Sequence, residues 1–372
     1  MDVVVPGQRP VTAQRRRLVI GSGSKFQPND TLFARITPCL ENGKIAQYRG
    51  VEPGFGSTEF FVLRAKPGIA LPEYVFYFAL NPELRAAAEK SMLGASGRQR
   101  AEISSLADFE CEFPPLPMQR RIAGILSAYD ELMENGQRRI RILETMARAL
   151  YREWFVHFRF PGHEKLPRVA SPLGDIPKGW TVKTVPDCVH VNPRVVVPRD
   201  GEKPFVPMRC LSNDSMLITD IESRAGNSGA KFQNGDTLFA RITPCLENGK
   251  TGFVQFLPDA DAVACGSTEF IVLRSHALTP EFVYCLARSV EFRGVAIKSM
   301  SGATGRQRVQ EQCFDDFQIA QPPRPLLDQF SAIVAPSFRL IYKLHLQIQN
   351  LRRTRDLLLP RLLSGQIEVE TI

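Results

Sequence analysis

An internal repeat constrains the fold of this chain more than any other feature. The segment from Lys25 to Lys44 recurs almost letter for letter from Lys231 to Lys250. Two further blocks return at nearly the same offset, Gly56 to Arg64 as Gly266 to Arg274, and Lys90 to Arg100 as Lys298 to Arg308. A period of about 200 residues is far longer than a solenoid unit, so the repeat predicts two related domains. The segments between the blocks differ, which indicates one scaffold with two divergent surfaces.

The composition agrees with two globular domains. At 372 residues and 41.7 kDa each half is large enough to bury its own core. Charged residues at 23% and apolar residues at 44% argue against an extensively disordered or fibrous chain. The net charge of +8 and the pI near 9.1 slightly favour a polyanionic partner.

The cysteines and the N-terminal residues indicate where in the cell the protein is expected. The eight cysteines contain no C-x-x-C pair, which favours free thiols over a disulfide framework or a metal site. Residues 1–6 do not resemble a signal peptide, and no apolar run approaches the length of a membrane span. We therefore expect a cytoplasmic, soluble protein.

The repeated blocks predict mixed α and β domains. Residues 30–36 and 236–242 alternate apolar and polar side chains and end at Thr-Pro, which is typical of a strand closed by a turn. The Asn-Gly pair that follows in each copy predicts a hairpin. Residues 58–63 and 268–273 predict further strands, and residues 72–80 and 280–287 open with Pro-Glu, as helices do.

The two copies differ at their beginnings. Only 24 residues precede the first Lys-Phe-Gln block, whereas a much longer lead-in through Trp180, Val195–Val197 and Phe205 precedes the second. Either the reading frame starts downstream of an ancestral start, or the first domain does without an opening strand.

A Pro-Pro-x-Pro sequence ends each domain, at residues 114–117 and 322–325, and a long helix is predicted after each. Apolar residues there recur at alternating steps of four and three, as in a coiled-coil seam, with Arg355 interrupting the second helix and Pro336 and Pro360 predicted to kink its ends. The two helices are expected to bury each other as an antiparallel pair, or each packs only on its own domain. The residues predicted to pack the pair are Ile122, Leu126, Tyr129, Ile140, Leu143, Leu150, Ile341, Leu344, Ile348 and Leu351.

This order of domain, Pro-Pro-x-Pro and long helix, given twice, resembles the specificity subunit of type I restriction-modification enzymes. Residues 115–122, 135–140 and 143–155 look like the central conserved region of that family. Leu358 to Ile367 looks like its distal conserved region, and Ile176 to Trp180 like the usual opening of a target-recognition domain. The resemblance covers nearly the whole chain.

The resemblance implies an α+β fold with two target-recognition domains that are joined and spaced by two long helices. The implied domains are residues 1–117, shortened at the N-terminus, and 161–325, with helical regions at 118–160 and 326–372. It further implies a non-catalytic subunit that reads a bipartite sequence in double-stranded DNA and docks two methyltransferase subunits, with restriction and translocation subunits joining them. S-adenosylmethionine, ATP and Mg²⁺ are then expected on the partner subunits, and no cofactor or metal in this chain.

The residues themselves show no methyltransferase motif and no phosphate-binding loop of the G-x-x-x-x-G-K-[ST] type. A rival hypothesis is a stand-alone Mg²⁺-dependent endonuclease. It would use the set Asp30, Glu41 and Lys44, repeated as Asp236, Glu247 and Lys250. A third is a truncated specificity subunit that reads only the half-site of residues 161–325. The five histidines are scattered without partners at metal-ligand spacing.

Contact with DNA is predicted first for the two copies of a glycine-rich loop, at residues 94–100 and 302–308. Glycines allow a close backbone approach, guanidiniums suit phosphates or guanine edges, and an amide suits adenine. The predicted DNA-binding residues in these loops are Arg98, Gln99, Arg100, Arg306, Gln307 and Arg308. Lys44 and Lys250 beside the Asn-Gly turns are further candidates, as are Arg35 and Arg241, which could equally be structural ion-pair partners.

Residues that are identical in both copies cannot distinguish two different half-sites, so they should mainly hold the phosphate backbone. Base choice is then expected in the segments that differ, 45–55 against 251–265 and 86–89 against 294–297, unless the two half-sites are nearly the same. A helix of about 35 residues is roughly 50 Å long. At about 3.4 Å per base pair, that length allows half-sites about one to one and a half DNA turns apart.

Overall fold

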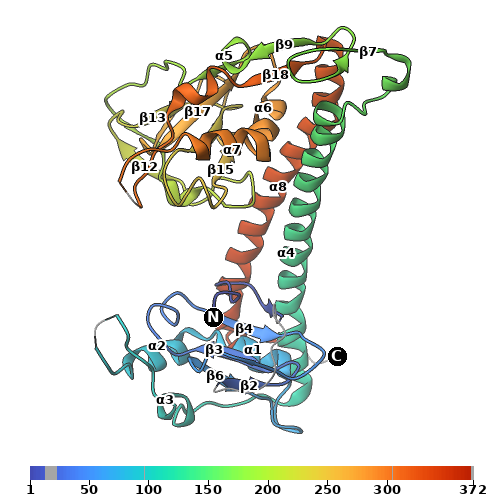
Figure 1. Ribbon diagram of the computed structural model, residues 1–372. Coiled ribbons are helices and arrows are strands. Elements are labelled where there is room, and N and C mark those ends of the chain that lie inside the picture. The colour runs from blue at the N-terminus through green and yellow to red at the C-terminus, as the bar shows by residue number, and fades with distance from the viewer. Residues whose placement is uncertain (13–22, 96, 304, 370–372) are drawn as a thin grey trace. The chain divides into compact units, whose positions relative to one another are not determined.

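The computed structural model describes residues 1–12, 23–95, 97–303 and 305–369. The chain divides into two compact units. Unit 1 comprises Met1–Gln137 and Leu346–Ile372, and unit 2 comprises Arg138–His345. Both combine α-helices with small β-sheets (Figure 1), so the predicted mixed α and β fold is confirmed.

Unit 1 contains one four-stranded sheet in the order β1-β4-β3-β6 and one two-stranded sheet, β2-β5. Strand β3 is antiparallel to both β4 and β6, and β1 is parallel to β4. Helix α1 packs against β3 and β4. The elements are β1 (Pro10–Val11), β2 (Ser24–Phe26), β3 (Thr31–Ala34), β4 (Ile45–Tyr48), β5 (Gly54–Gly56), β6 (Phe60–Leu63), α1 (Pro72–Ala79), α2 (Pro82–Lys90) and α3 (Ser104–Ala107).

Unit 2 contains two four-stranded sheets, β10-β17-β14-β15 and β12-β11-β16-β13, and the two-stranded pairs β18-β9 and β7-β8. The register of β17 on β14 begins with Thr237 opposite Leu273, and β6 on β3 begins in the same way with Thr31 opposite Leu63. The strands are β7 (Arg168–Val169), β8 (Ile176–Pro177), β9 (Thr181–Thr184), β10 (Val189–Val191), β11 (Glu202–Val206), β12 (Glu222–Ala225), β13 (Ala230–Phe232), β14 (Thr237–Ala240), β15 (Thr251–Phe253), β16 (Ala264–Gly266), β17 (Phe270–Ser275) and β18 (Gln318–Gln321). The helices are α5 (Val185–Cys188), α6 (Pro280–Ala287) and α7 (Val290–Lys298).

Two long helices follow the Pro-Pro sequences, as predicted. Helix α4 runs from Leu116 to Tyr151 and continues as a π-helical turn to Val156, and α8 runs from Arg324 to Leu363. Helix α8 is continuous through Pro336 and Pro360. In the described part of the chain, no helix combines the length and the apolarity that crossing a membrane requires.

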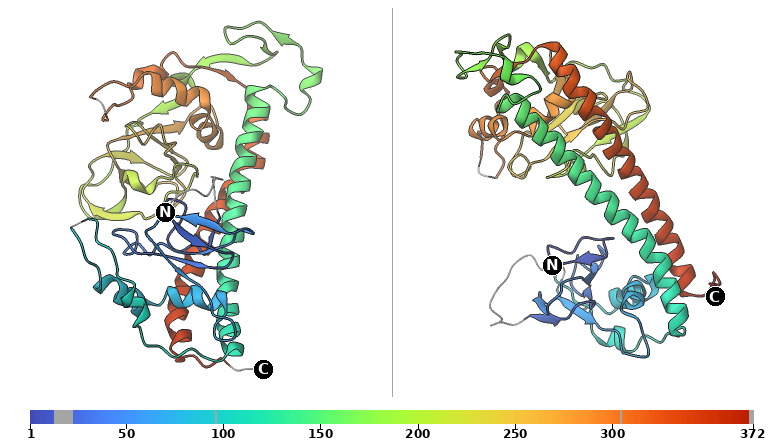
Figure 2. Two further views of the ribbon diagram at one scale, coloured as in Figure 1. Left: turned by 60° about the horizontal axis from the view of Figure 1, so that its bottom comes forward. Right: turned by 90° about the vertical axis from the view of Figure 1, so that its right-hand side faces the viewer.

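Each unit contains a segment of both long helices, and the two segments pack together (Figure 2). In unit 1, Ile122 and Leu126 of α4 share one hydrophobic core with Leu359 and Leu362 of α8. In unit 2, the rings of Tyr151 and Phe155 contact that of Phe330, at centroid distances of 6.5 and 4.9 Å. Large apolar side chains thus bind the helices to each other inside each unit.

The predicted helix starts are confirmed, whereas the predicted two-residue turns are wrong. Helices begin at Pro72 and Pro280, where the sequence placed them. The predicted hairpins are antiparallel pairs, β3 with β4 and β14 with β15, but ten residues separate the two strands, including a cis Thr-Pro bond at Pro38 or Pro244. Thus Asn-Gly ends a longer connection and does not form a two-residue turn by itself.

Candidate nucleic-acid interface

The two glycine-rich loops are held by equivalent backbone contacts. Arg100 forms β-bridges with Leu93 and Ile36, and Arg308 does so with Ser301 and Ile242. The Gln99 carbonyl accepts hydrogen bonds from the N–H and the hydroxyl of Thr37, both at 3.0 Å. These bonds fasten the first loop beside the end of strand β3.

Glycines shape these loops. Gly94 has a φ of 125° and Gly302 a φ of 123°, which side-chain-bearing residues rarely adopt. Gly97 and Gly305 also have positive φ, at 81° each. The chain can therefore reverse tightly and present backbone at the tip.

Arg98 and Arg306 occupy the exposed tips. Within the described residues, neither guanidinium has a hydrogen-bond or ion-pair partner, while each backbone N–H closes a turn on Ala95 or Ala303. Gln99 and Gln307 lie half-buried beside them. A guanidinium that no intramolecular carboxylate neutralises is suited to bind a phosphate.

Arg100 and Arg308, by contrast, are bound to carboxylates of their own domain. Arg100 donates to Glu59 at 2.8 Å and Arg308 to Glu269 at 2.6 Å, through both the Nε and Nη2 groups. These hydrogen bonds, opposed by partial burial and assisted by the positive charges, lower the pKa of Glu59 and of Glu269. Side-chain exposures of 44% and 49% leave both arginines accessible at their outer edges.

The remaining predicted cations also have internal partners. Arg35 lies 3.9 Å from Glu59 and over the ring of Phe61, and Arg241 lies 2.6 Å from Glu311. These contacts support the interpretation of Arg35 and Arg241 as structural ion-pair partners.

Lys44 and Lys250 bind backbone carbonyls. Lys44 donates to the carbonyl of Met1 at 3.4 Å, and Lys250 to that of Met208 at 3.0 Å. Both lysines anchor the start of a neighbouring segment.

A basic groove in unit 2 was missed by the sequence analysis. Arg194 and Lys231 line it together with Arg241, and the rest of the lining is apolar or uncharged: Asn192, Pro193, Val195, Val196, Gly229, Ala230, Thr268, Phe270 and Val272. Lys231 and Arg241 lie in the repeated block of unit 2, whereas Arg194 comes from the lead-in before it, so no local motif signals the groove as a whole. Arg194 and Lys231 give the groove a positive charge suited to a polyanion, whereas Arg241 is already paired with Glu311.

The helix seam contains buried charges that the apolar pattern did not predict. Asp130 and Glu144 of α4 are each 2% exposed, and Arg355 of α8 is 3% exposed. Of the ten residues predicted to pack the helices, Ile122, Leu126, Ile140, Ile341, Leu344 and Ile348 are buried and Tyr129, Leu143, Leu150 and Leu351 are half-buried. The carboxylates thus lie deeper than their neighbours Tyr129 and Leu143.

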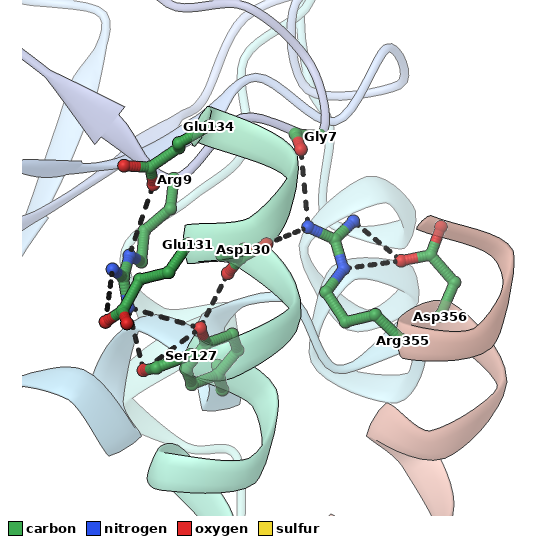
Figure 3. A network of polar contacts seen from close by, with 9 residues as sticks. Gly7, Arg9, Ser127, Asp130, Glu131, Glu134, Arg355 and Asp356 are labelled. Atoms are coloured by element: carbon green, nitrogen blue, oxygen red, sulfur yellow. Dashed lines mark hydrogen bonds and ion pairs between the residues drawn. The ribbon is translucent and has the colours of Figure 1, made fainter. Parts of the chain in front are cut away.

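Asp130 is the centre of a polar network in unit 1 (Figure 3). Its carboxylate accepts from Arg355 of α8 at 2.5 Å and from the hydroxyl of Tyr77 of α1 at 2.6 Å. Arg9 reaches the same cluster through Ser127, at 2.7 Å, and lies 3.8 Å from Glu134. The network ties the N-terminal segment, α1, α4 and α8 together.

Glu144 plays a similar part in unit 2. It accepts from the Tyr284 hydroxyl at 2.5 Å and from the Met216 N–H at 3.1 Å, and Arg288 lies 3.7 Å away. Burial first, and the Glu144 charge second, raise the pKa of Tyr284 well above its usual value. In both units an α-helical tyrosine therefore donates to a carboxylate of α4.

The rival nuclease set is not arranged as a metal centre. Asp30 and Asp236 are buried and bound bidentately by Arg64 and Arg274, with closest contacts of 2.6 Å. Glu41 is exposed, and Lys44 is committed to a carbonyl. Over the described residues, no cluster of three or more His, Cys, Asp or Glu side chains could hold a metal ion.

Comparisons with known proteins agree on one family. Residues 26–144 match the family described as "Type I restriction modification DNA specificity domain". The chain is 26% identical over 325 residues to the type I restriction enzyme MjaIX specificity subunit of Methanocaldococcus jannaschii, covering 82% of this chain and 71% of that protein. It is 31% identical over 156 residues to the EcoEI specificity subunit of Escherichia coli, covering 40% of this chain and 26% of that protein.

The fold comparison agrees with the sequence comparisons. The solved type I restriction-modification S subunit from M. genitalium superposes with a TM-score of 0.52 at 13% identity, covering 99% of this chain and 91% of that one. The sequence matches therefore point to one family: residues 26–144 match its DNA specificity domain, and over 82% of its length the chain is similar to a type I restriction enzyme specificity subunit.

Proposed function

We propose that this chain is the DNA-recognition subunit of a type I restriction-modification enzyme and has no catalytic site of its own. The observation that carries the proposal is the pair of loop tips at Arg98 and Arg306, exposed and without intramolecular partners among the described residues, on a chain of this family. Each loop would hold the DNA backbone beside one half of a bipartite target in double-stranded DNA.

Base choice would lie in the segments that differ between the halves, where the structure narrows the candidates. Ile45–Tyr48, Thr251–Phe253 and Ala264–Gly266 are buried strands, and Val254 and Leu257 are buried as well. Residues 49–55, 255, 256 and 258–263 therefore remain as the candidates there for contacting base edges.

We further propose that α4 and α8 form the antiparallel coiled coil that spaces two equivalent target-recognition domains, residues 1–117 and 161–325. The contacts of the start of α4 with the end of α8, and of the end of α4 with the start of α8, support the antiparallel direction. Inserting one heptad in each helix should lengthen the DNA spacer and leave the half-sites unchanged.

The partners follow from the same proposal. Two methyltransferase subunits would dock on the helices, restriction and translocation subunits would join them in the cytoplasm, and S-adenosylmethionine, ATP and Mg²⁺ would be bound by those partners.

A second candidate is a subunit that reads only the half-site of residues 161–325. The basic groove of unit 2 favours it, because Asn192 to Val196, which form one wall, have no equivalent among the 24 residues printed before the first repeated block. Both candidates share the DNA-binding role and differ in the number of half-sites.

One experiment tests the proposal and separates the candidates. The chain, with a cognate methyltransferase subunit, is incubated with a randomised DNA pool at a stated salt concentration, and bound DNA is sequenced. Two motifs at fixed spacing support the bipartite reader, and one motif supports the half-site reader. Failure to enrich any sequence, together with Mg²⁺-dependent cutting by the isolated chain, would favour the nuclease.

Arg306→Ala and Arg98→Ala serve as matched variants in that selection. Each should weaken binding without changing the enriched sequence, because a phosphate contact carries no base information. A changed motif would assign base reading to the loop.

A further inference from the structure

Arg35 and Arg241 occupy equivalent positions in the two halves. The Arg35 N–H donates to the Glu59 carbonyl and the Arg241 N–H donates to the Glu269 carbonyl, both at 3.0 Å. Each arginine directly follows a central strand, β3 or β14. A difference between the two guanidiniums must therefore come from the side chains around them.

In unit 2 a carboxylate neutralises the guanidinium. Arg241 donates to Glu311 through Nη1 at 2.6 Å, and its Nη2 donates to the Val309 carbonyl at 3.4 Å. The second oxygen of Glu311 accepts from the Asn192 amide at 2.7 Å, which holds the carboxylate in place. Arg241 thus has its ion-pair partner within the protein, and an external anion would have to displace that partner.

In unit 1 the equivalent guanidinium has no such partner. The sequence continues without gaps from the repeated block, and Ile103 stands where the second half has Glu311. Among the described residues the Arg35 guanidinium makes no hydrogen bond, and Glu59 Oε2 lies 3.9 Å from its Nε. Both Glu59 oxygens already accept hydrogen bonds from Arg100, at 2.8 and 3.0 Å. The segment between β1 and β2 contains no acidic residue. The positive charge of Arg35 is therefore only weakly compensated.

An aromatic ring holds Arg35 where a carboxylate holds Arg241. The Arg35 guanidinium lies 5.0 Å from the ring centroid of Phe61. Ile271 stands at the equivalent position in unit 2, as the shared strand register shows. A ring face orients a guanidinium and attracts it, but carries no net charge that would neutralise it. The first half thus fixes the direction of this side chain and keeps its positive charge.

A pocket of about 440 Å³ lies beside this guanidinium. Its lining consists of Arg35, Leu93, Arg100, Ala101, Glu102 and Ile103. Leu93 and Ile103 are 64% and 60% exposed, so they give the pocket an apolar rim. Glu102 is exposed and has no ion pair among the described residues, so solvent and salt screen its charge. A guanidinium without a bound carboxylate, beside an apolar rim, suits a ligand that carries an anionic group next to an apolar one.

We propose that this pocket binds one phosphate of the DNA backbone together with its deoxyribose, and that Arg241 makes no such contact. The inference rests on the proposed DNA recognition and assigns different roles to two arginines that the repeat makes identical. Arg35 would donate to the phosphate oxygens, and Leu93 and Ile103 would pack against the carbon atoms of the sugar. The two halves would then hold the DNA backbone differently, although their repeated blocks are nearly the same.

The test compares the two equivalent arginines. The full chain, with a cognate methyltransferase subunit, is titrated against a fluorescent DNA duplex at several salt concentrations. Arg35→Gln should reduce the slope of log affinity against log salt by about 0.9, so the ratio of the affinities at 50 and 200 mM salt should shrink about 3.5-fold. Arg241→Gln is the matched control. It should leave this slope unchanged and lower the unfolding temperature of unit 2, because Glu311 loses its ion-pair partner.

Substitutions at the exposed rim test the same contact without altering the core. Ile103→Glu gives the first half the carboxylate that pairs with Arg241 in the second, and should reduce the salt slope as Arg35→Gln does. Ile103→Gln, of the same size as glutamate but uncharged, should keep the slope. Leu93→Ser should lower the affinity by the same factor at every salt concentration, because an apolar contact releases no counterions.

The outcomes separate this inference from the proposed function. An unchanged slope for both Arg35→Gln and Ile103→Glu, or an equal loss of slope for Arg35→Gln and Arg241→Gln, would overturn the inference. If Arg98→Ala still weakens binding in that case, the proposed DNA recognition stands. Absence of DNA binding by the unaltered chain would overturn both.

Discussion

Asp130 offers the most informative single substitution in this protein. Its carboxylate is 2% exposed, is bound by Arg355 at 2.5 Å, and also accepts from Tyr77. Asp130→Asn keeps the shape and removes the charge. Among the described residues, Asp356, whose side chain is 56% exposed, is then the carboxylate partner that remains for the buried Arg355.

The burial of this ion pair sets the loss of stability expected for Asp130→Asn. Removing one partner of a buried ion pair costs about 3–5 kcal/mol, because the other charge stays desolvated. Since Asp356 still neutralises part of the Arg355 charge, we expect the low end, about 3 kcal/mol. The double variant Asp130→Leu, Arg355→Met removes both charges, and should be more stable than Asp130→Asn alone.

The pair of Arg324 and Asp328 is a suitable control. Its closest contact is 2.8 Å, similar to that of the buried pair, but its side chains are 65% and 55% exposed. Asp328→Asn should therefore cost only about 0–0.5 kcal/mol.

Native-state hydrogen exchange is the appropriate assay, because a chain with two units need not unfold in one step. Asp130→Asn should lower the opening free energy of β3 and α1 in unit 1 and leave β14 in unit 2 unchanged. A loss no larger than that of Asp328→Asn, or a double variant less stable than the single one, would refute the assignment of this pair as a buried clamp.

Three further predictions concern the loops and the buried tyrosine. Arg306→Ala should reduce the slope of log affinity for DNA against log salt by about 1, measured by anisotropy titrations at several salt concentrations. The folded-state pKa of Glu59 and Glu269 is lowered. Their stabilisation is therefore present above the unfolded value of about 4.3 and is lost as pH falls through the lower folded value, which amide exchange in the loops should detect. The folded-state pKa of Tyr284 is raised. Its contribution to the stability of unit 2 is therefore complete below the unfolded pKa of about 10 and is lost as the pH rises from there through the higher folded value. Absorbance titration should show the Tyr284 tyrosinate only as unit 2 unfolds.

Much of the architecture could be predicted from local patterns. Alternation identified β3 and β14, the Pro-Glu openings identified α1 and α6, and the steps of four and three identified both long helices. These signals are local because strand and helix periodicity repeat within one element.

The polar part of the helix interface could not be predicted in this way. Asp130 and Glu144 look like ordinary solvent-facing residues of a helix, and Arg355 looks like an interruption of the seam. They are buried because Tyr77 and Tyr284, more than 50 residues away along the chain, supply donors. The hydrogen-bond partners of a buried charge come from residues that are distant in the sequence, so the periodicity of one helix cannot predict its burial.

The loops show the same limit. Arg98 and Arg100 are equally basic in the sequence, yet one is without a partner among the described residues and the other is bound by Glu59, which lies 41 positions away. The sequence predicted a basic loop but could not show which of its arginines has a carboxylate partner within the protein.

The bond between Arg308 and Glu269 has a consequence for how the protein would search a genome. Any DNA phosphate that approaches this guanidinium competes with a carboxylate already in place, so the loop has an intramolecular rival for the nucleic acid. Random DNA then gains little from the contact, which keeps non-specific complexes short-lived. If Arg308 contacts DNA as proposed, only a site whose base contacts supply additional free energy would displace the carboxylate. The Arg308–Glu269 pair would then act as a threshold between scanning and arrest.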